Sequence, residues 1–251
     1  MQLLLVSLII SFLLAPSDLL PSEAHDTDQV SLYRPNYFIF DGNRDAKFQI
    51  SYRIRLLKIS NWVDLFVSHT HKALWAITSE NSAPFREHNL NPEIYFRWDN
   101  PELGIPLKHF QAGFEHESTG VAGDQSRSWN RLSGQIEWEF FTEGKKRKGH
   151  LHTHVRGWII VDKDEELNPD IDEFIGSWEL NAGYILHERL KFGGEIAMTL
   201  RKRSIMMDYG VKIPHVDFFF YLQYWKGRGE WLVNYKEKTD TFRFGLKFFV
   251  K

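Results

Sequence analysis

The chain has 251 residues, and its 31 basic and 33 acidic residues leave a formal net charge of −2 at pH 7, which excludes the broad positive field of a nucleic-acid-binding protein. It contains no cysteine, which excludes a disulfide framework and a thiolate metal site. Packing and strand pairing must therefore hold the fold together.

The amino-terminal segment has the pattern of a secretory signal peptide. An apolar run covers residues 3–14, and small residues precede an expected cleavage after Ala24. The run is shorter than the roughly 20 residues that a transmembrane helix needs. We therefore expect residues 1–24 to be removed on export and residues 25–251 to form one domain without a membrane-spanning helix.

Apolar and polar residues alternate through the rest of the chain, in segments long enough to cross a bilayer as tilted strands. Twelve strands are predicted, at residues 36–42, 45–58, 61–77, 92–98, 106–118, 129–142, 149–162, 174–187, 189–200, 205–213, 216–226 and 241–250. An even number lets a sheet close with both chain ends on one side. The 20 Phe, 9 Trp and 9 Tyr in a chain that is 25% charged favour an outer-membrane protein. The prediction is an all-β fold, a twelve-stranded antiparallel transmembrane β-barrel.

The last segment shows the alternation most clearly, because Phe242, Phe244, Leu246 and Phe248 share one face. In a membrane barrel this face would meet lipid. In a secreted, soluble β-sandwich it would meet a second sheet, and periodicity alone does not separate the two. The export signal and the strand lengths favour the barrel, and a soluble binding protein remains an alternative.

Two neighbouring segments carry polar residues on their apolar faces. Along 106–118 the even-numbered positions are apolar until they reach His116 and Ser118, and along 129–142 the apolar face begins with Asn130. In a barrel that face is the lipid side. Three polar side chains are therefore predicted to project from the outer wall, near the mouth of one hairpin.

These three residue types can form a serine-hydrolase set. If His116 pairs opposite Asn130, their Cβ atoms lie about 5 Å apart, and Ser118 is two positions along the same face. Histidine can take the serine proton through one ring nitrogen while the asparagine carbonyl accepts from the other. A neutral amide also avoids the desolvation cost of an ionised aspartate at a lipid boundary. The alternative is that these side chains only mark the headgroup zone of a non-catalytic barrel, such as a small channel or a structural protein.

The sequence at this hairpin resembles the outer membrane phospholipase A family. The resemblance lies in His-Glu-Ser-Thr-Gly at 116–120, followed by Ser-Arg-Ser-Trp-Asn-Arg at 126–131, at the family's own separation. Other similar pieces follow the family's order, at residues 35–37, 82–87, 168–171 and 229–230. Together they cover nearly all of the chain after the expected signal.

The resemblance implies an enzyme that hydrolyses acyl ester bonds of phospholipids and lysophospholipids, with both A1 and A2 activity. It implies Ser118 as nucleophile, His116 as base and Asn130 as the residue that orients His116. It also implies Ca²⁺, held by the Ser126 hydroxyl, the Val121 carbonyl and the carbonyl of Ser82 from a second subunit, which are oxygen ligands of the kind that calcium takes. The implied protein is a calcium-promoted homodimer that crosses the outer membrane of a Gram-negative cell many times, with its active site toward the outer leaflet.

Three positions depart from the family pattern. Thr119 stands where the family has asparagine, and Val121 where it has arginine. A backbone ligand at Val121 survives this change of side chain. His71 falls where the family has an interface glutamine, which bears on the strength and the pH dependence of a dimer.

Three other clusters suggest no chemistry of their own. The acidic stretch 162–173 lacks the glycine of a calcium-binding EF-hand loop and is predicted to be a solvated extracellular loop. The basic run 145–148 is predicted to be a solvated turn. His150, His152 and His154 alternate on one strand, where inward-facing barrel positions are favoured over a metal site.

Overall fold

The computed structural model describes residues 29–42, 45–78, 82–99, 106–143, 148–187, 194–216 and 218–248. The expected signal peptide, residues 1–24, and the basic run at 145–147 lie outside these ranges. Among the described residues no helix is long and apolar enough to cross a membrane.

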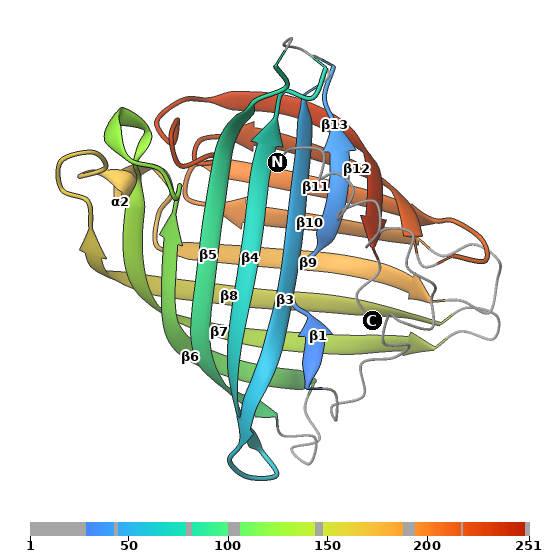
Figure 1. Ribbon diagram of the computed structural model, residues 1–251. Coiled ribbons are helices and arrows are strands. Elements are labelled where there is room, and N and C mark those ends of the chain that lie inside the picture. Colours follow the sequence, from blue (N-terminus) through green and yellow to red (C-terminus); the bar gives the residue numbers. More distant parts are fainter. Residues whose placement is uncertain are drawn as a thin grey trace.

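The chain forms a closed antiparallel β-barrel (Figure 1). Its strands are β1 (Val30–Leu32), β2 (Asn36–Phe40), β3 (Ala46–Lys58), β4 (Val63–Trp75), β5 (Phe85–Asp99), β6 (Leu107–Ser118), β7 (Ser128–Glu143), β8 (Lys148–Lys163), β9 (Trp178–His187), β10 (Gly194–Arg201), β11 (Ser204–Lys212), β12 (Phe218–Gly227) and β13 (Thr239–Phe248). β13 pairs with β2, which closes the sheet. β1 and β2 pair with successive parts of β3 and are two pieces of one barrel strand, so the wall has twelve strands, as predicted.

The strand boundaries differ from the prediction mainly at β5, which begins at Phe85 instead of residue 92. The prediction began this strand at Pro92, which has no N–H to give to a neighbouring strand. In the structure β4 still pairs across this position, with His69 opposite Pro92. On the other side, the pairing with β6 passes from Leu90 directly to Glu93. A proline therefore interrupts one ladder without ending the strand.

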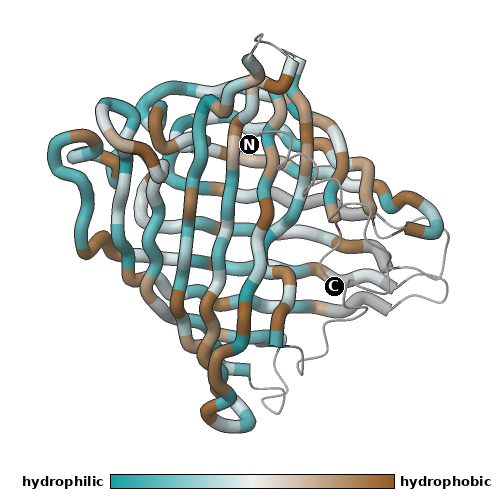
Figure 2. Tube along the Cα trace, in the orientation of Figure 1, coloured by the Kyte–Doolittle hydropathy of each residue, from teal (hydrophilic) through white to brown (hydrophobic). Residues whose placement is uncertain are grey.

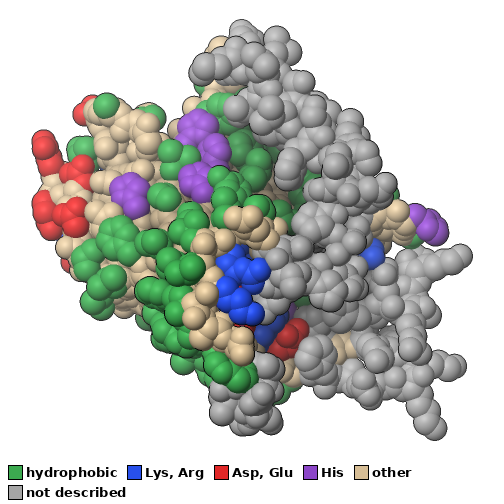
Figure 3. All heavy atoms as spheres, turned by 60° about the horizontal axis from the view of Figure 1, so that its bottom comes forward, with side chains coloured by type: hydrophobic (Ala, Val, Ile, Leu, Met, Phe, Trp, Pro, Cys, Tyr) green, Lys and Arg blue, Asp and Glu red, His purple; other side chains and the backbone are tan. Residues whose placement is uncertain are grey.

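Hydrophobic and polar residues alternate along the strands, as the colours of Figure 2 show. Phe110, Phe114 and Leu132 are exposed on the outer wall, whereas Glu115 and Arg131 are buried on the inner side. One face of the molecule is largely hydrophobic, with histidine side chains gathered in one part of it (Figure 3). The outer wall therefore presents hydrocarbon toward lipid, as the period of two predicts.

Charged residues fill the barrel interior. Glu115 accepts hydrogen bonds from Arg131 and Arg156, and Arg156 also donates to Glu93 at 2.9 Å. Arg34 donates to the other oxygen of Glu93 at 2.6 Å. These buried charges are all paired, which a low-dielectric interior requires. The polar cavity between them measures only about 90 Å³.

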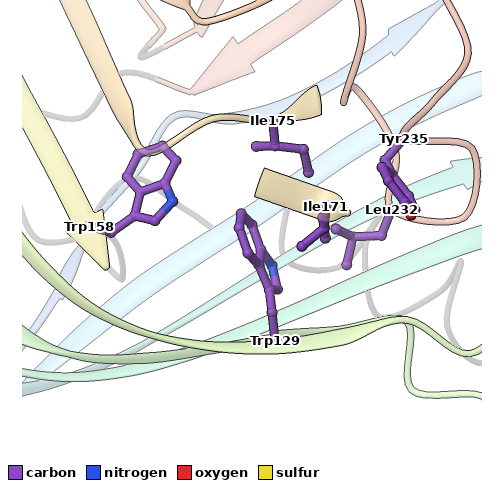
Figure 4. Close-up of a cluster of buried hydrophobic side chains, with 6 residues drawn as sticks. All are labelled: Trp129, Trp158, Ile171, Ile175, Leu232 and Tyr235. Carbon is purple, nitrogen blue, oxygen red and sulfur yellow. The ribbon is translucent and has the colours of Figure 1, made fainter. Parts of the chain in front are cut away.

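Two long connections close the barrel at the end that carries the β6–β7 loop. The connection between β8 and β9 contains the short helix α2 (Ile171–Phe174), which packs beside the connection between β12 and β13. Figure 4 shows the apolar cluster that these connections form with β7 and β8, made of Trp129, Trp158, Ile171, Ile175, Leu232 and Tyr235 and called the plug below. In the same place Lys236 and Tyr235 hydrogen-bond to Asp170 and lower the pKa of its carboxyl group. This plug gives the adjacent hairpin a rigid support.

Candidate active site

The β6–β7 hairpin brings the predicted polar residues together. His116 lies directly opposite Asn130, which is the pairing that the serine-hydrolase hypothesis requires, and Ser118 lies opposite Ser128. All are half-buried and belong to the outward-facing set of their strands. The regular alternation of these two strands is what places His116, Ser118 and Asn130 on the lipid-facing wall.

A hydrogen bond joins His116 to Asn130. His116 Nδ1 lies 2.8 Å from Asn130 Oδ1. A carbonyl oxygen can only accept, so Nδ1 carries the hydrogen and donates it. The other ring nitrogen, Nε2, is then left with a lone pair. Within the described chain no hydrogen bond joins His116 to Ser118, although Ser118 is two positions along the same face. Such bonds are often long without substrate.

The gap beside Pro92 is closed by a side chain. Because Pro92 has no N–H and the β5–β6 pairing skips its position, the His116 carbonyl lacks a ladder partner there. The Asn91 side-chain amide donates to that carbonyl at 2.7 Å and to Glu115 at 3.1 Å. Asn91 is buried, so these bonds tie the backbone of His116 to the charged interior.

The loop after Ser118 is held by its own residues. The Thr119 hydroxyl donates to the Gln125 carbonyl at 3.0 Å and accepts from the Arg127 N–H at 3.1 Å. The Arg127 guanidinium donates to the carbonyls of Asp124 and Ser126 at 2.8 and 2.6 Å. Threonine at position 119, which departs from the family pattern, therefore clamps the base of this loop.

A second support comes from the connection between β8 and β9. Asn168 accepts from the Ser128 N–H at 3.1 Å and donates to the Ser128 carbonyl at 3.0 Å. Asn168 is fully buried. The two bonds fix the start of β7 just before Asn130.

The three residues expected to hold calcium lie on two connections. Val121 and Ser126 share the β6–β7 loop, on either side of the 3-10 turn η3 (Gly123–Gln125), whereas Ser82 lies exposed between β4 and β5. Within the described residues neither the Val121 carbonyl nor the Ser126 hydroxyl has a hydrogen-bond partner, so both oxygens are free to bind a cation. These neutral oxygens suit calcium, which takes six to eight oxygen ligands. Calcium binding by these residues stays a prediction.

No grouping of three or more His, Asp or Glu side chains suited to a metal occurs in the part of the chain that the structure describes. His154 faces the barrel interior and pairs with Glu179 at 3.5 Å, which agrees with a structural role. His71 lies on the outer wall of β4, where its Nε2 is 2.9 Å from His88 Nδ1.

One residue beside the set was not predicted to belong to it. Asp162 was expected where the strand 149–162 meets the acidic loop 162–173, with no part in the site; it is the second-last residue of β8 and lies opposite Asn130. Asn130 Nδ2 donates to Asp162 Oδ2 at 3.0 Å. The sequence signal that could have found Asp162 is the predicted pairing of the two strands, which places the end of β8 beside the start of β7.

The comparisons with known proteins agree with this architecture. The Phospholipase A1 family model matches residues 15–248. Phospholipase A1 of Klebsiella pneumoniae is 31% identical over 211 residues, covering 80% of this chain and 69% of the relative. Phospholipase A1 of Escherichia coli K12 is 30% identical over 198 residues, covering 76% of this chain and 65% of the relative.

Solved structures share the fold. The outer membrane phospholipase of Salmonella typhi, solved as a dimer with bound calcium, has a TM-score of 0.71 at 21% identity and covers 90% of this chain and 94% of its own. Outer membrane phospholipase A of Escherichia coli has a TM-score of 0.70 at 23% identity, with 93% and 96% covered.

Proposed function

The chain belongs to the phospholipase A1 family of enzymes and is an outer-membrane β-barrel, and we propose that it is a calcium-dependent serine hydrolase of phospholipid acyl esters. Ser118 is the nucleophile, His116 the general base and Asn130 the residue that orients His116. The observation that carries this assignment is the hydrogen bond from His116 to Asn130 on the lipid-facing wall. Hydrocarbon side chains are expected there, and this imidazole lies two positions from a serine on the same face.

The reaction follows from the geometry of the hairpin. A lipid in the bilayer presents its ester near the headgroup level, beside the mouth of the hairpin. The Ser118 hydroxyl attacks the ester carbonyl while His116 Nε2 takes its proton, and Asn130 stabilises the imidazolium through Nδ1. His116 then gives the proton to the leaving alcohol, and water releases the acyl group by the same route in reverse. Phospholipids and lysophospholipids, cleaved at either acyl position, are the substrate class.

Val121 and Ser126 would hold calcium through their carbonyl and hydroxyl oxygens, and Ser82 of a second subunit would supply a further carbonyl. When bound, calcium supplies positive charge beside the oxyanion that forms at the ester carbonyl. The pairing pattern supports a dimer over this wall, because His71 lies opposite Leu90, and Leu90 lies opposite Ser118. A partner that covers His71 would therefore also approach the active site.

The topology supports an active site toward the outer leaflet. Asn36 of β2 pairs with Phe248 of β13, so the described part of the chain begins and ends toward the end of the barrel opposite the β6–β7 loop. The longest connections, residues 76–84, 119–127, 164–177 and 228–238, all lie on the side of that loop. Bacterial barrels have short periplasmic turns and long extracellular loops.

The alternative of a passive channel is opposed by the interior. Paired arginine and glutamate side chains cross the lumen, and the plug closes one end. The polar cavity among these side chains has a volume of about 90 Å³, room for a few water molecules.

The test is Ser118→Ala in the refolded, detergent-solubilised protein. The substitution should reduce hydrolysis of a lysophospholipid to background, because the nucleophile is lost, while heat-modifiable gel migration shows the same folded barrel. Ser204→Ala, at the start of β11 at the same end of the barrel, is the control and should keep full activity. Near-wild-type turnover by a folded Ser118→Ala protein would refute the assignment.

A further inference from the structure

The alternation of inward-facing and outward-facing side chains is interrupted near the end of β8. Along the lower part of this strand, Val155 and Ile159 are exposed outside, whereas Arg156 and Trp158 are buried inside. The pairing with β7 then passes from Ile160, opposite Arg131, to Asp162, opposite Asn130. One residue of β8, Val161, is therefore extra, and the strand contains a β-bulge.

The bulge determines where the Asp162 side chain points. An uninterrupted strand would turn the even-numbered Asp162 toward the interior, with Arg156 and Trp158. The extra residue reverses the parity and places the carboxylate outside, where it accepts the bond from Asn130. Bulges commonly re-aim a side chain beside an active site.

We propose that Asp162 is a positioning residue that fixes the orientation of the Asn130 amide, so that the site is a relay of Ser118, His116, Asn130 and Asp162. This inference rests on the proposed function. The amide of an asparagine has a donor end and an acceptor end of nearly equal size. Only the orientation with the oxygen toward His116 lets the imidazole donate from Nδ1 and keep its lone pair on Nε2.

An ionised carboxylate selects that orientation. Asp162 only accepts hydrogen bonds, so it holds the Nδ2 end of Asn130 at 3.0 Å and leaves the Oδ1 end for His116 at 2.8 Å. The reversed amide would place two acceptor oxygens against each other. The three side chains come from adjacent strands β6, β7 and β8, so the sheet itself sets their spacing.

Nothing else in the described chain engages Asp162. The neighbouring Lys163 is directed away, to the Pro169 carbonyl and to Asp172 at 3.2 Å. Asp164 accepts from the N–H groups of Glu166 and Leu167 at 3.0 and 2.9 Å and shapes the turn. Of the charged residues at 162–164, Asp162 alone is directed at the hydrolase residues. It is exposed, so water at the headgroup level solvates its charge while the neutral amide separates it from the acyl chains.

The test measures kcat and KM on one lysophospholipid at saturating calcium, for Asp162→Ala and Asp162→Asn. Asp162→Ala should lower kcat by about threefold to tenfold, the effect of one net hydrogen bond, with little change in KM. Asp162→Asn keeps an acceptor oxygen but adds a donor that a reversed Asn130 amide can also use, so it should recover only part of the loss. Glu165→Gln, which removes a negative charge from an exposed site in the same acidic stretch, is the matched control and should behave as wild type.

The second arm places Asp162→Ala in the Asn130→Ala background. Because Asp162 acts through Asn130, it should cause no further loss there, whereas a residue that only shapes the loop would lower kcat in both backgrounds. Wild-type kcat for Asp162→Ala, or an equal loss in both backgrounds, would overturn the inference. Ser118→Ala is measured alongside. If it is inactive while Asp162→Ala is unaffected, only the relay fails, and if Ser118→Ala is active, the proposed function itself fails.

Discussion

Asparagine suits the position between imidazole and carboxylate because it is neutral. An aspartate at position 130 would place a charge next to the exposed Phe114 and Leu132, on the wall that meets lipid. The neutral amide stands between His116 and Asp162, so the charged carboxylate that orients it lies at the end of β8, where water is available. The arrangement separates the charge from the hydrocarbon without leaving the imidazole unpaired.

Replacement of His116 and replacement of Asn130 should lower turnover by unequal amounts. Asn130→Ala should lower turnover but leave more activity than His116→Ala, because the amide orients the imidazole whereas the imidazole transfers the proton. Both variants are assayed on one lysophospholipid at saturating calcium, with gel migration as the folding control. Equal turnover by Asn130→Ala and the wild-type enzyme would remove Asn130 from the mechanism.

The sequence predicts some of these residues better than others. The period-two alternation correctly places His116 and Asn130 on the same outward face, because both strands are regular near the loop, and the structure supplies the register that sets them opposite each other. It does not predict the contact of Asp162 with Asn130, because the bulge at Val161 adds a residue that no periodicity shows. The assignment of Ser82, Val121 and Ser126 as calcium ligands is a prediction from the family resemblance alone, since loop carbonyls have no sequence pattern.

At the scale of the strands, prediction succeeds where one face meets lipid and the other meets water or charge. It is wrong at the start of β5, because proline there is compatible with a strand whose missing ladder bond is replaced by the Asn91 side chain. It also omits β1, which covers only Val30–Leu32 and is too short to show alternation. Whether a side chain replaces a missing hydrogen bond between strands depends on residues that are distant in sequence, so the local alternation does not predict it.

The pairing of β5 with β6 depends on a glycine. A Cβ atom added at Gly113 would lie closer than 3.0 Å to the Ile94 carbonyl oxygen and to the Tyr95 backbone. Gly113→Ala should therefore destabilise the barrel by about 1–3 kcal/mol, because the obstacle is backbone that cannot move freely. The measurement is the temperature at which the folded gel band is lost.

Gly134→Ala is the matched control for this prediction. Gly134 lies on β7, and an added Cβ there would meet its nearest neighbour, the Gln111 carbonyl oxygen, at 3.8 Å, an ordinary contact. The band should persist to the wild-type temperature in this variant. If Gly113→Ala is as stable as Gly134→Ala, the close approach of the two strands is not as tight as the structure has it.

At the scale of the whole molecule, the two faces of the wall have separate tasks. The interior carries the paired charges and the plug, which connect strands from several parts of the wall. The outer face carries the proposed hydrolase residues, so in the proposed mechanism substrate would reach them from the membrane without entering the lumen. Asn91 links the two, because it joins the His116 backbone outside to Glu115 inside.

Activity and self-association should respond to calcium together. One chain supplies only the Val121 and Ser126 oxygens at the β6–β7 loop, and the further carbonyl expected from Ser82 comes from a second subunit, so the ion stabilises the dimer and completes the site in the same event. Sedimentation of the detergent-solubilised protein and lysophospholipid hydrolysis are followed over one calcium titration, and a chelator should reverse both. Ser126→Ala should move both midpoints to higher calcium, whereas Ser204→Ala on β11 should leave them in place. Full turnover in excess chelator by a protein that sediments as a monomer would exclude this coupling.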